Sequence, residues 1–254
     1  MLCEFEELHR ILSVDLGVEV HLLTHEIFEG APEAMYINDW FSTHLETGKP
    51  TMVLYPMKMD SRKNEITEQK IHFLQSLAKF DILNLSGSNN EGVQFNKQFV
   101  PRSQPLPEDS TTVNMHSLEQ GSVVFDRMQK LVFASEACTR LSKDVVAVML
   151  RELGSNYESH YFRLVDCNNA LVERLHHTRA ILAVGTQVAF VCREAILPED
   201  YPALAAKLAG PQKRKIIEVT LEQASSLLIV ALAEVLDQSG EPVLVMSQSA
   251  RALL

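Results

Sequence analysis

One order of elements recurs along the amino-acid sequence: two neighbouring β-type apolar runs, then a helical stretch, then a third apolar run. This order occupies residues 35–85, 118–165 and 178–219, and it begins again at residue 226. A pattern that returns every ~50 to 80 residues with little residue identity indicates repeated supersecondary units. A propeller of ββαβ units fits this pattern. A doubly wound α/β sheet fits it less well, because that architecture joins its strands through helices and not through hairpins.

Local periodicity predicts the individual elements. Apolar residues at helical spacing predict helices over residues 4–15 and 62–78, and an apolar run predicts a strand over residues 18–24. Residues 35–57 predict a β-hairpin. Residues 86–114 are polar and predict a loop of roughly 25 residues, a length that is usually functional or disordered.

Length and composition restrict the fold class and the partners. A chain of 254 residues with 46% hydrophobic side chains can bury a sizeable core in one large domain or two small ones. We expect one domain over residues 1–254, of α/β class, built as a β/α propeller with an incomplete last unit. The formal net charge of −10 argues against a nucleic-acid or anionic-membrane surface, since either would need clustered Lys and Arg.

Targeting signals are not evident in the sequence. No segment approaches the ~18 apolar residues of a membrane helix. The N-terminal residues MLCEFEELHRIL are acidic where a signal peptide would be basic. We therefore expect a cytoplasmic protein without a membrane partner.

The cysteines form no recognisable framework. Cys3, Cys138, Cys167 and Cys192 are scattered, without a CxxC pair or a zinc-ligand spacing. Free thiols are therefore expected. Cys192 ends the apolar run VAFVC and is predicted to be buried, whereas Cys167 lies in the polar stretch DCNNA and is predicted to be more exposed.

The segment with the clearest site character begins at His176-His177-Thr178. It precedes two β-type apolar runs that flank a turn at Gly185-Thr186. A polar His-Thr pair at the mouth of a buried strand is a place where a site residue would be displayed. A metal site that combines either histidine with Asp39 and His44 is disfavoured. Adjacent strand residues face opposite sides, and none of these residues has metal-ligand spacing.

Six blocks, in order, resemble the amidinotransferase superfamily of guanidine-modifying β/α propellers, and most closely its citrulline-hydrolase-like branch. The blocks are AMYINDWFSTH, TMVLYPMKMDSRKNE, SLEQGSVVFDR, HHTRAILAVGTQVAFVC, IIEVTLEQ and EPVLVMSQSARALL. The resemblance covers roughly residues 4–254. It implies a small-molecule substrate with a guanidino or ureido group.

The chemistry of that superfamily explains the residue types. A carboxylate grips the guanidinium nitrogens, a cysteine thiolate attacks the carbon, and a histidine moves protons for the leaving amine. The resemblance implies that Asp39 grips the substrate and that His177 is the general acid/base. It implies that Glu119 is a second carboxylate that orients His177, and that Asn38 completes the substrate-binding set. A thiolate and a histidine suffice for this chemistry, so no cofactor or metal is implied.

Several positions depart from the family pattern. Arg179 stands where the family has a neutral amide, and it would repel a guanidinium but could hold a substrate carboxylate. The turn at Glu119–Ser122 is one residue shorter than the family's, and an apolar run replaces a Gly-Asn pair at residues 227–230. The family's nucleophilic cysteine lies beyond the PVLVMS block, near which this chain stops. The resemblance therefore implies a member trimmed at both ends, without that nucleophile.

Alternatives remain open at each level. The chain could be a catalytically inactive pseudoenzyme that binds or scaffolds, or a plain α/β interaction module. His177 could instead be a capping or surface histidine, Asp39 a turn residue, and Glu119 a solvated charge at a strand edge. Trp40 is predicted to lie in the core. Because an incomplete propeller leaves open strand edges, a homo-oligomer is also expected.

Overall fold

The structure is a computed structural model. It describes residues 2–23, 39–46, 48–85, 117–154, 156–165, 175, 177–226, 229, 233–237 and 239–253. Within these residues lie three sheets of three strands and one of two strands. Helices separate strands in each unit, so the expected α/β class is confirmed. The predicted loop over residues 86–114 lies outside the described residues.

Each three-stranded sheet joins an antiparallel hairpin to a third, parallel strand. The first unit contains β1 (Phe41–His44), β2 (Thr51–Leu54), α3 (Glu68–Ala78) and β3 (Asp81–Asn84). The second contains β4 (Val123–Asp126), β5 (Leu131–Ser135), α4 (Lys143–Glu152) and β6 (Glu158–Phe162). The third contains β7 (Leu182–Val184), β8 (Val188–Cys192), α7 (Tyr201–Ala209) and β9 (Lys215–Val219). The predicted order of hairpin, helix and strand is thus confirmed in three places.

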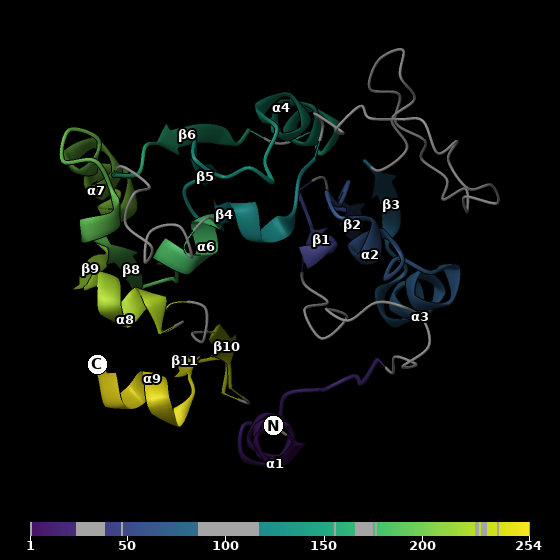
Figure 1. The fold of residues 1–254 in the computed structure, drawn as a ribbon. Helices are drawn as coiled ribbons and strands as arrows, with labels where there is room; N and C mark the ends of the chain where they lie inside the picture. Colours follow the sequence, from purple (N-terminus) through teal and green to yellow (C-terminus); the bar gives the residue numbers. More distant parts are fainter. Residues whose placement is uncertain are drawn as a thin grey trace.

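A further antiparallel hairpin follows the third unit. It consists of β10 (Ala233–Leu236) and β11 (Pro242–Val245), with α8 (Leu221–Ser225) before it and α9 (Gln248–Leu253) after it. The sheets follow one another round the molecule in chain order, and α3, α4 and α7 lie on its outer side (Figure 1). The first segments of the three units consequently face the middle of the arrangement.

The N-terminal segment departs in part from expectation. The helix expected over residues 4–15 is present as α1 (Leu2–Arg10), which continues as a π-helical turn, η1 (Ile11–Asp15). The strand expected over residues 18–24 is wrong for the described residues 18–23, which are not strand. An apolar run becomes a strand only where a neighbour accepts its backbone hydrogen bonds, and no described strand pairs with this segment.

The helix expected over residues 62–78 is divided in two. A short helix, α2 (Asp60–Lys63), ends before Glu65, and α3 begins after Thr67. The Thr67 side chain accepts the backbone N–H of Lys70, which satisfies one of the unpaired donors at the start of α3. Arg62, in α2, and Glu65, in the turn that follows it, both have buried side chains.

Strand β5 connects the two hydrophobic clusters of the core. All of its side chains are buried, and successive side chains face opposite ways. Leu131 and Phe133 pack in one cluster with the third unit, with Ala224 of α8 and with Ala250 of α9. Val132 and Ala134 pack with the first unit and with Trp40, which is buried as predicted. The first three units are therefore packed against one another through the second.

Candidate active site

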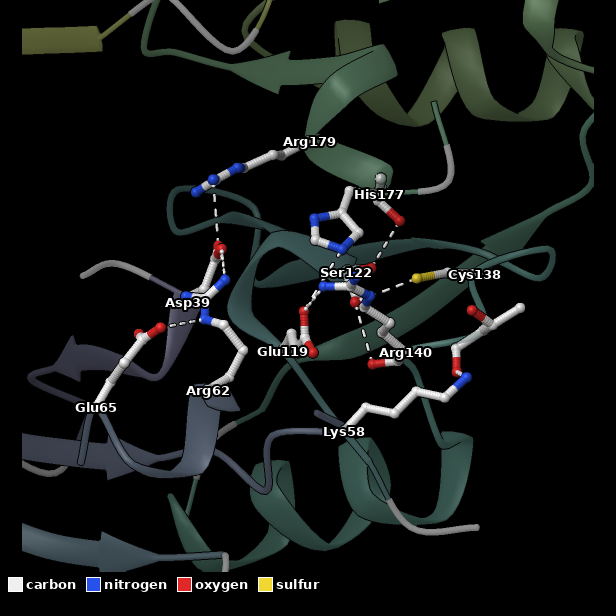
Figure 2. Close-up of polar contacts among 12 residues, drawn as sticks. Asp39, Lys58, Arg62, Glu65, Glu119, Ser122, Cys138, Arg140, His177 and Arg179 are labelled. Carbon is white, nitrogen blue, oxygen red and sulfur yellow. Dashed lines mark hydrogen bonds and ion pairs between the residues drawn. The ribbon is translucent and has the colours of Figure 1, made fainter. Parts of the chain in front are cut away.

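Four of the residues singled out in the sequence meet where the first segments of the units converge (Figure 2). Asp39 lies just before β1. Glu119 precedes a 3₁₀ turn, η4 (Gln120–Ser122), that leads into β4. His177 and Arg179 belong to a helical turn, α6 (Thr178–Ile181), that leads into β7. Each unit thus contributes from the same structural position, ahead of its first strand.

Thr178 fixes the position of His177. Its buried hydroxyl donates to the backbone carbonyl of Ser122 at 2.6 Å and accepts the backbone N–H of Ser135 at 2.9 Å. These two bonds fasten the start of α6 to the second unit. The third unit was predicted to open on a β-type run from residue 178. This is wrong for residues 178–181, because the hydroxyl anchor holds them in a helical turn and the strand begins at Leu182. His177 is consequently the N-cap residue of α6 and does not lie on a strand.

Glu119 lies behind the His177 imidazole. The Glu119 side chain is fully buried, and its Oε2 lies 3.5 Å from His177 Nε2. Arg140 Nη1 donates to the same oxygen at 2.9 Å. A buried carboxylate beside one ring nitrogen restricts the orientation of the imidazole.

Asp39 carries charge contacts on both carboxylate oxygens. Arg62 Nη1 donates to Oδ2 at 3.2 Å, and Arg179 Nη2 lies 3.2 Å from Oδ1. Arg62 Nε in turn pairs with the buried Glu65 at 2.6 Å. Burial alone would lower the pKa of Arg62, but Glu65 and Asp39 raise that pKa above its ordinary value. Arg62 is therefore a fixed buried cation.

Gly121 leaves room for the convergence of these groups. A methyl group at its α-carbon would lie 2.8 Å from His177 Nδ1, 3.2 Å from Asp39 Oδ1 and 3.4 Å from Arg179 Nε. The three side chains therefore pack closely around the α-carbon of Gly121. Because Nε2 of His177 faces Glu119, the ring directs its other nitrogen, Nδ1, toward Gly121.

Other residues weighed in the sequence lie elsewhere or cannot be placed. Asn38 and His176 are outside the described residues. His44 belongs to a buried network: Ser42 Oγ lies 2.6 Å from His44 Nε2 and 2.7 Å from Tyr55 Oη. Burial, assisted by the charge of Arg127, lowers the pKa of His44 to about 4. His44 is thus a neutral core histidine near pH 7. Among the described residues, no cluster of His, Cys, Asp or Glu could hold a metal ion.

Cys138 and Cys192 lie among the described residues, and both are buried. Burial raises the pKa of the Cys138 thiol, which donates to Ser122 Oγ at 3.2 Å. Burial also raises the pKa of Cys192 to about 11. Cys192 was predicted to be buried, and this is confirmed. Neither thiol has the lowered pKa of an activated nucleophile. Cys167 lies outside the described residues.

The raised thiol pKa values lead to a direct prediction. At pH 8 we expect iodoacetamide to alkylate Cys192 about 10²-fold more slowly in the folded protein than in urea, because the reactive thiolate is scarce. Peptide mass spectrometry after timed alkylation separates Cys192 from the other thiols. Equal rates in folded and unfolded protein would contradict the buried, protonated state.

Arg62, Glu65, Arg140 and Gly121 were not expected in the site. The first two stand in the block TMVLYPMKMDSRKNE, whose Arg and Glu are spaced three residues apart. That spacing was the available signal, but it gave no indication that Arg62 would reach Asp39. Gly121 stands in the turn at Glu119–Ser122, which the sequence identified only as shorter than the turn of the family pattern.

Comparisons with known proteins bear on the lineage. The family model described as N,N dimethylarginine dimethylhydrolase, eukaryotic, matches residues 1–254. A search of curated protein sequences gave no match. Within the described residues, no helix has the length and apolarity needed to cross a membrane.

Solved structures share the fold at low identity. The N-terminal domain of ArgZ, a cyanobacterial arginine dihydrolase, was solved with bound substrate. It matches with a TM-score of 0.61 and 15% identity, over 98% of this chain and 74% of that chain. Apo ArgZ matches with a TM-score of 0.62 and 16% identity, over 98% of this chain and 30% of that chain. A dimethylarginine hydrolase from Pseudomonas aeruginosa, in complex with citrulline, matches with a TM-score of 0.54 and 15% identity, over 88% of this chain and 67% of that chain.

These findings confirm the expected membership of the amidinotransferase and dimethylarginine hydrolase superfamily. They also support a lineage of guanidino-group hydrolases. Because the family model spans all 254 residues, the chain belongs to the eukaryotic N,N-dimethylarginine dimethylhydrolase family.

Proposed function

We propose that this protein binds guanidino or ureido compounds of arginine or citrulline type and hydrolyses a C–N bond with a thiolate nucleophile, as in the citrulline-hydrolase-like branch. His177 is the general acid/base and Glu119 orients it. Asp39 grips the nitrogens of the substrate, and Asn38 and Arg179 complete the binding set. A thiolate and an imidazole provide the covalent and proton-transfer steps, so the proposal includes no cofactor.

The observation that carries this proposal is the convergence around Gly121. Nδ1 of His177 and Oδ1 of Asp39 lie 2.8 and 3.2 Å from the position that a methyl group on Gly121 would take, so both polar groups approach the same side of this turn. A planar guanidinium or ureido group bound between them could donate N–H bonds to Asp39 while its leaving nitrogen faces His177. Charge-assisted bonds of this kind give geometric specificity as well as affinity.

The ring orientation supports one direction of proton transfer. Since Glu119 Oε2 lies 3.5 Å from His177 Nε2, we propose that Nδ1 is the nitrogen that gives or takes a proton in the site. In hydrolysis of arginine, a thiolate other than those of the buried Cys138 and Cys192 bonds to the guanidinium carbon, and His177 protonates the departing ammonia. Water then attacks the same carbon, His177 accepts its proton, and the thiolate leaves citrulline as the product.

A second candidate is a pseudoenzyme that binds such compounds without turnover. Two observations favour it. The described thiols of Cys138 and Cys192 are buried and protonated. The Asp39 carboxylate is already paired with Arg179 in the free protein. On this alternative, the same residues recognise a ligand whose binding is the function.

Release of ammonia or methylamines distinguishes hydrolysis from binding without turnover. We expect the protein to release them from at least one of L-arginine, L-citrulline and the methylated arginines. We expect His177→Ala to lower the rate about 10²- to 10⁴-fold, the usual contribution of general acid/base catalysis. His72→Ala, at an exposed histidine on α3, is the matched control. Absence of release from every substrate by the unaltered protein would contradict hydrolysis and favour the pseudoenzyme.

We further propose that the repeated units form a β/α propeller within one domain over residues 1–254. The shared ββαβ order of three units and the fourth hairpin support this architecture. The hairpin β10–β11 has no third strand among the described residues. Its open edges support the expected self-association.

A further inference from the structure

Asp39 meets two guanidinium groups that differ in how firmly they are held. Arg62 has a side chain that is 2% exposed, and Glu65 as well as Asp39 holds its guanidinium. Arg179 has a side chain that is 20% exposed, and Asp39 is its ion-pair partner in the described part of the chain. Arg62 is thus a permanent component of the site, whereas Arg179 is the more exposed of the two cations and has fewer carboxylate partners among the described residues.

The charges of the site are balanced before any ligand arrives. Three carboxylates, those of Asp39, Glu65 and Glu119, face three guanidinium groups, those of Arg62, Arg140 and Arg179. A cationic ligand that approaches Asp39 would add a fourth positive group to this set. Since like charges in a partly buried site repel strongly, that ligand cannot bind while Arg179 remains in place.

The position of Arg179 is that of a guanidinium ligand. Its Nη2 contacts Asp39 Oδ1, and its Nε lies 3.4 Å from the position of a methyl group on Gly121, which Asp39 and His177 also approach. In Figure 2 its side chain extends from α6 toward Asp39. The side chain therefore presents to Asp39 the same planar, N–H-bearing group that the proposed substrates carry.

We propose that the side chain of Arg179 is an internal guanidinium group. It pairs with the Asp39 carboxylate in the free protein and thereby determines which ligands bind. A ligand must displace it from Asp39, and the displaced cation then requires an anionic partner. A guanidino compound that also carries a carboxylate supplies both groups, so the site selects amino-acid-type ligands against simple guanidinium ions. The inference rests on the proposed function, because it assumes that Asp39 is the ligand-gripping carboxylate.

Methylguanidinium, which has no carboxylate, is the probe that isolates this role. Calorimetric titration and thermal melting are carried out on the unaltered protein, on Arg179→Ala and on Arg179→Ala with Asp39→Asn. We expect Arg179→Ala to bind methylguanidinium at least about 10-fold more tightly than the unaltered protein, because the Asp39 carboxylate that Arg179 no longer occupies accepts the ion. We expect the double variant to lose this binding. Arg193→Ala, at an exposed arginine paired with Glu218, is the matched control.

A second ligand separates the inference from the proposed function. Arg179→Ala should change the affinity for L-arginine much less than the affinity for methylguanidinium. The variant frees the Asp39 carboxylate for the guanidinium group, but it also removes the cation that would bind the carboxylate of L-arginine, so the two effects offset each other. Equal methylguanidinium affinity in the unaltered protein and in Arg179→Ala would overturn the inference while leaving the proposed function intact. Binding of methylguanidinium by Arg179→Ala, with no binding of arginine or citrulline by any variant, would uphold the internal guanidinium but contradict the proposed substrates. Arg179→Gln replaces the alanine variant if that fails to fold.

Discussion

Arg62→Ala is expected to lower the free energy of unfolding by about 3–5 kcal/mol, the usual cost of removing one partner of a buried ion pair. The Arg62 side chain is 2% exposed and pairs with Glu65 at 2.6 Å and with Asp39 at 3.2 Å. Its removal leaves the Glu65 carboxylate buried without this cation. Urea unfolding followed by circular dichroism measures the change.

Arg151→Ala is the matched control for this prediction. Arg151 is an exposed arginine at the end of α4 that pairs only with its neighbour Glu152 among its described contacts. Its substitution should change the free energy of unfolding by less than about 0.5 kcal/mol. An Arg62→Ala variant that loses less than about 1 kcal/mol would show that the site does not depend on a fixed buried cation.

Asp126→Ala is expected to have an effect of similar size, about 3–5 kcal/mol. Asp126 ends β4, and its Oδ2 accepts Nη1 of the buried Arg214 at 2.8 Å. Its Oδ1 accepts the backbone N–H groups of Met128 and Gln129, which closes the β4–β5 turn. Because Arg214 lies just before β9, this ion pair connects the second unit to the third. The loss should appear in urea unfolding.

The same ion pair predicts a dependence of stability on pH. Burial would raise the pKa of Asp126, but the bonds from Arg214 and Gln129 lower it below its ordinary value of 3.8. A lowered folded-state pKa means that the stabilisation is present above pH 3.8 and is lost as the pH falls through the folded-state value. The stability difference between the unaltered protein and Asp126→Asn should therefore shrink below about pH 4. A difference that stays constant from pH 6 to pH 3 would contradict an ionised Asp126 in the folded protein.

The repeat of elements and the four convergent residues could be predicted from the sequence for different reasons. Hairpins, helices and parallel strands leave apolar periodicities that are local, so residues 118–165 predicted β4, β5, α4 and β6 in order. Asp39, Glu119, His177 and Arg179 were reached through a resemblance between ordered blocks. No local pattern indicated that they would lie together.

The details of the site could not be predicted, because they depend on contacts between distant segments. Thr178 belongs to a helical turn since its hydroxyl bonds to Ser122 and Ser135, which an apolar run cannot reveal. Arg179 was recognised as a departure from the family pattern, but its ion pair with Asp39 follows from the packing of the third unit against the first. The role of Gly121 is visible only when its three neighbours are in place.

The most direct test of the central claim, that Asp39 and His177 form one ligand site, is an NMR titration of the His177 imidazole with L-arginine. We expect the ring signals to shift saturably in the unaltered protein, since Nδ1 of His177 and Oδ1 of Asp39 both approach Gly121. In Asp39→Asn the shift should be lost or should need an at least ~10-fold higher ligand concentration. His177 signals that do not respond to arginine, or that respond equally in both proteins, would contradict a shared site.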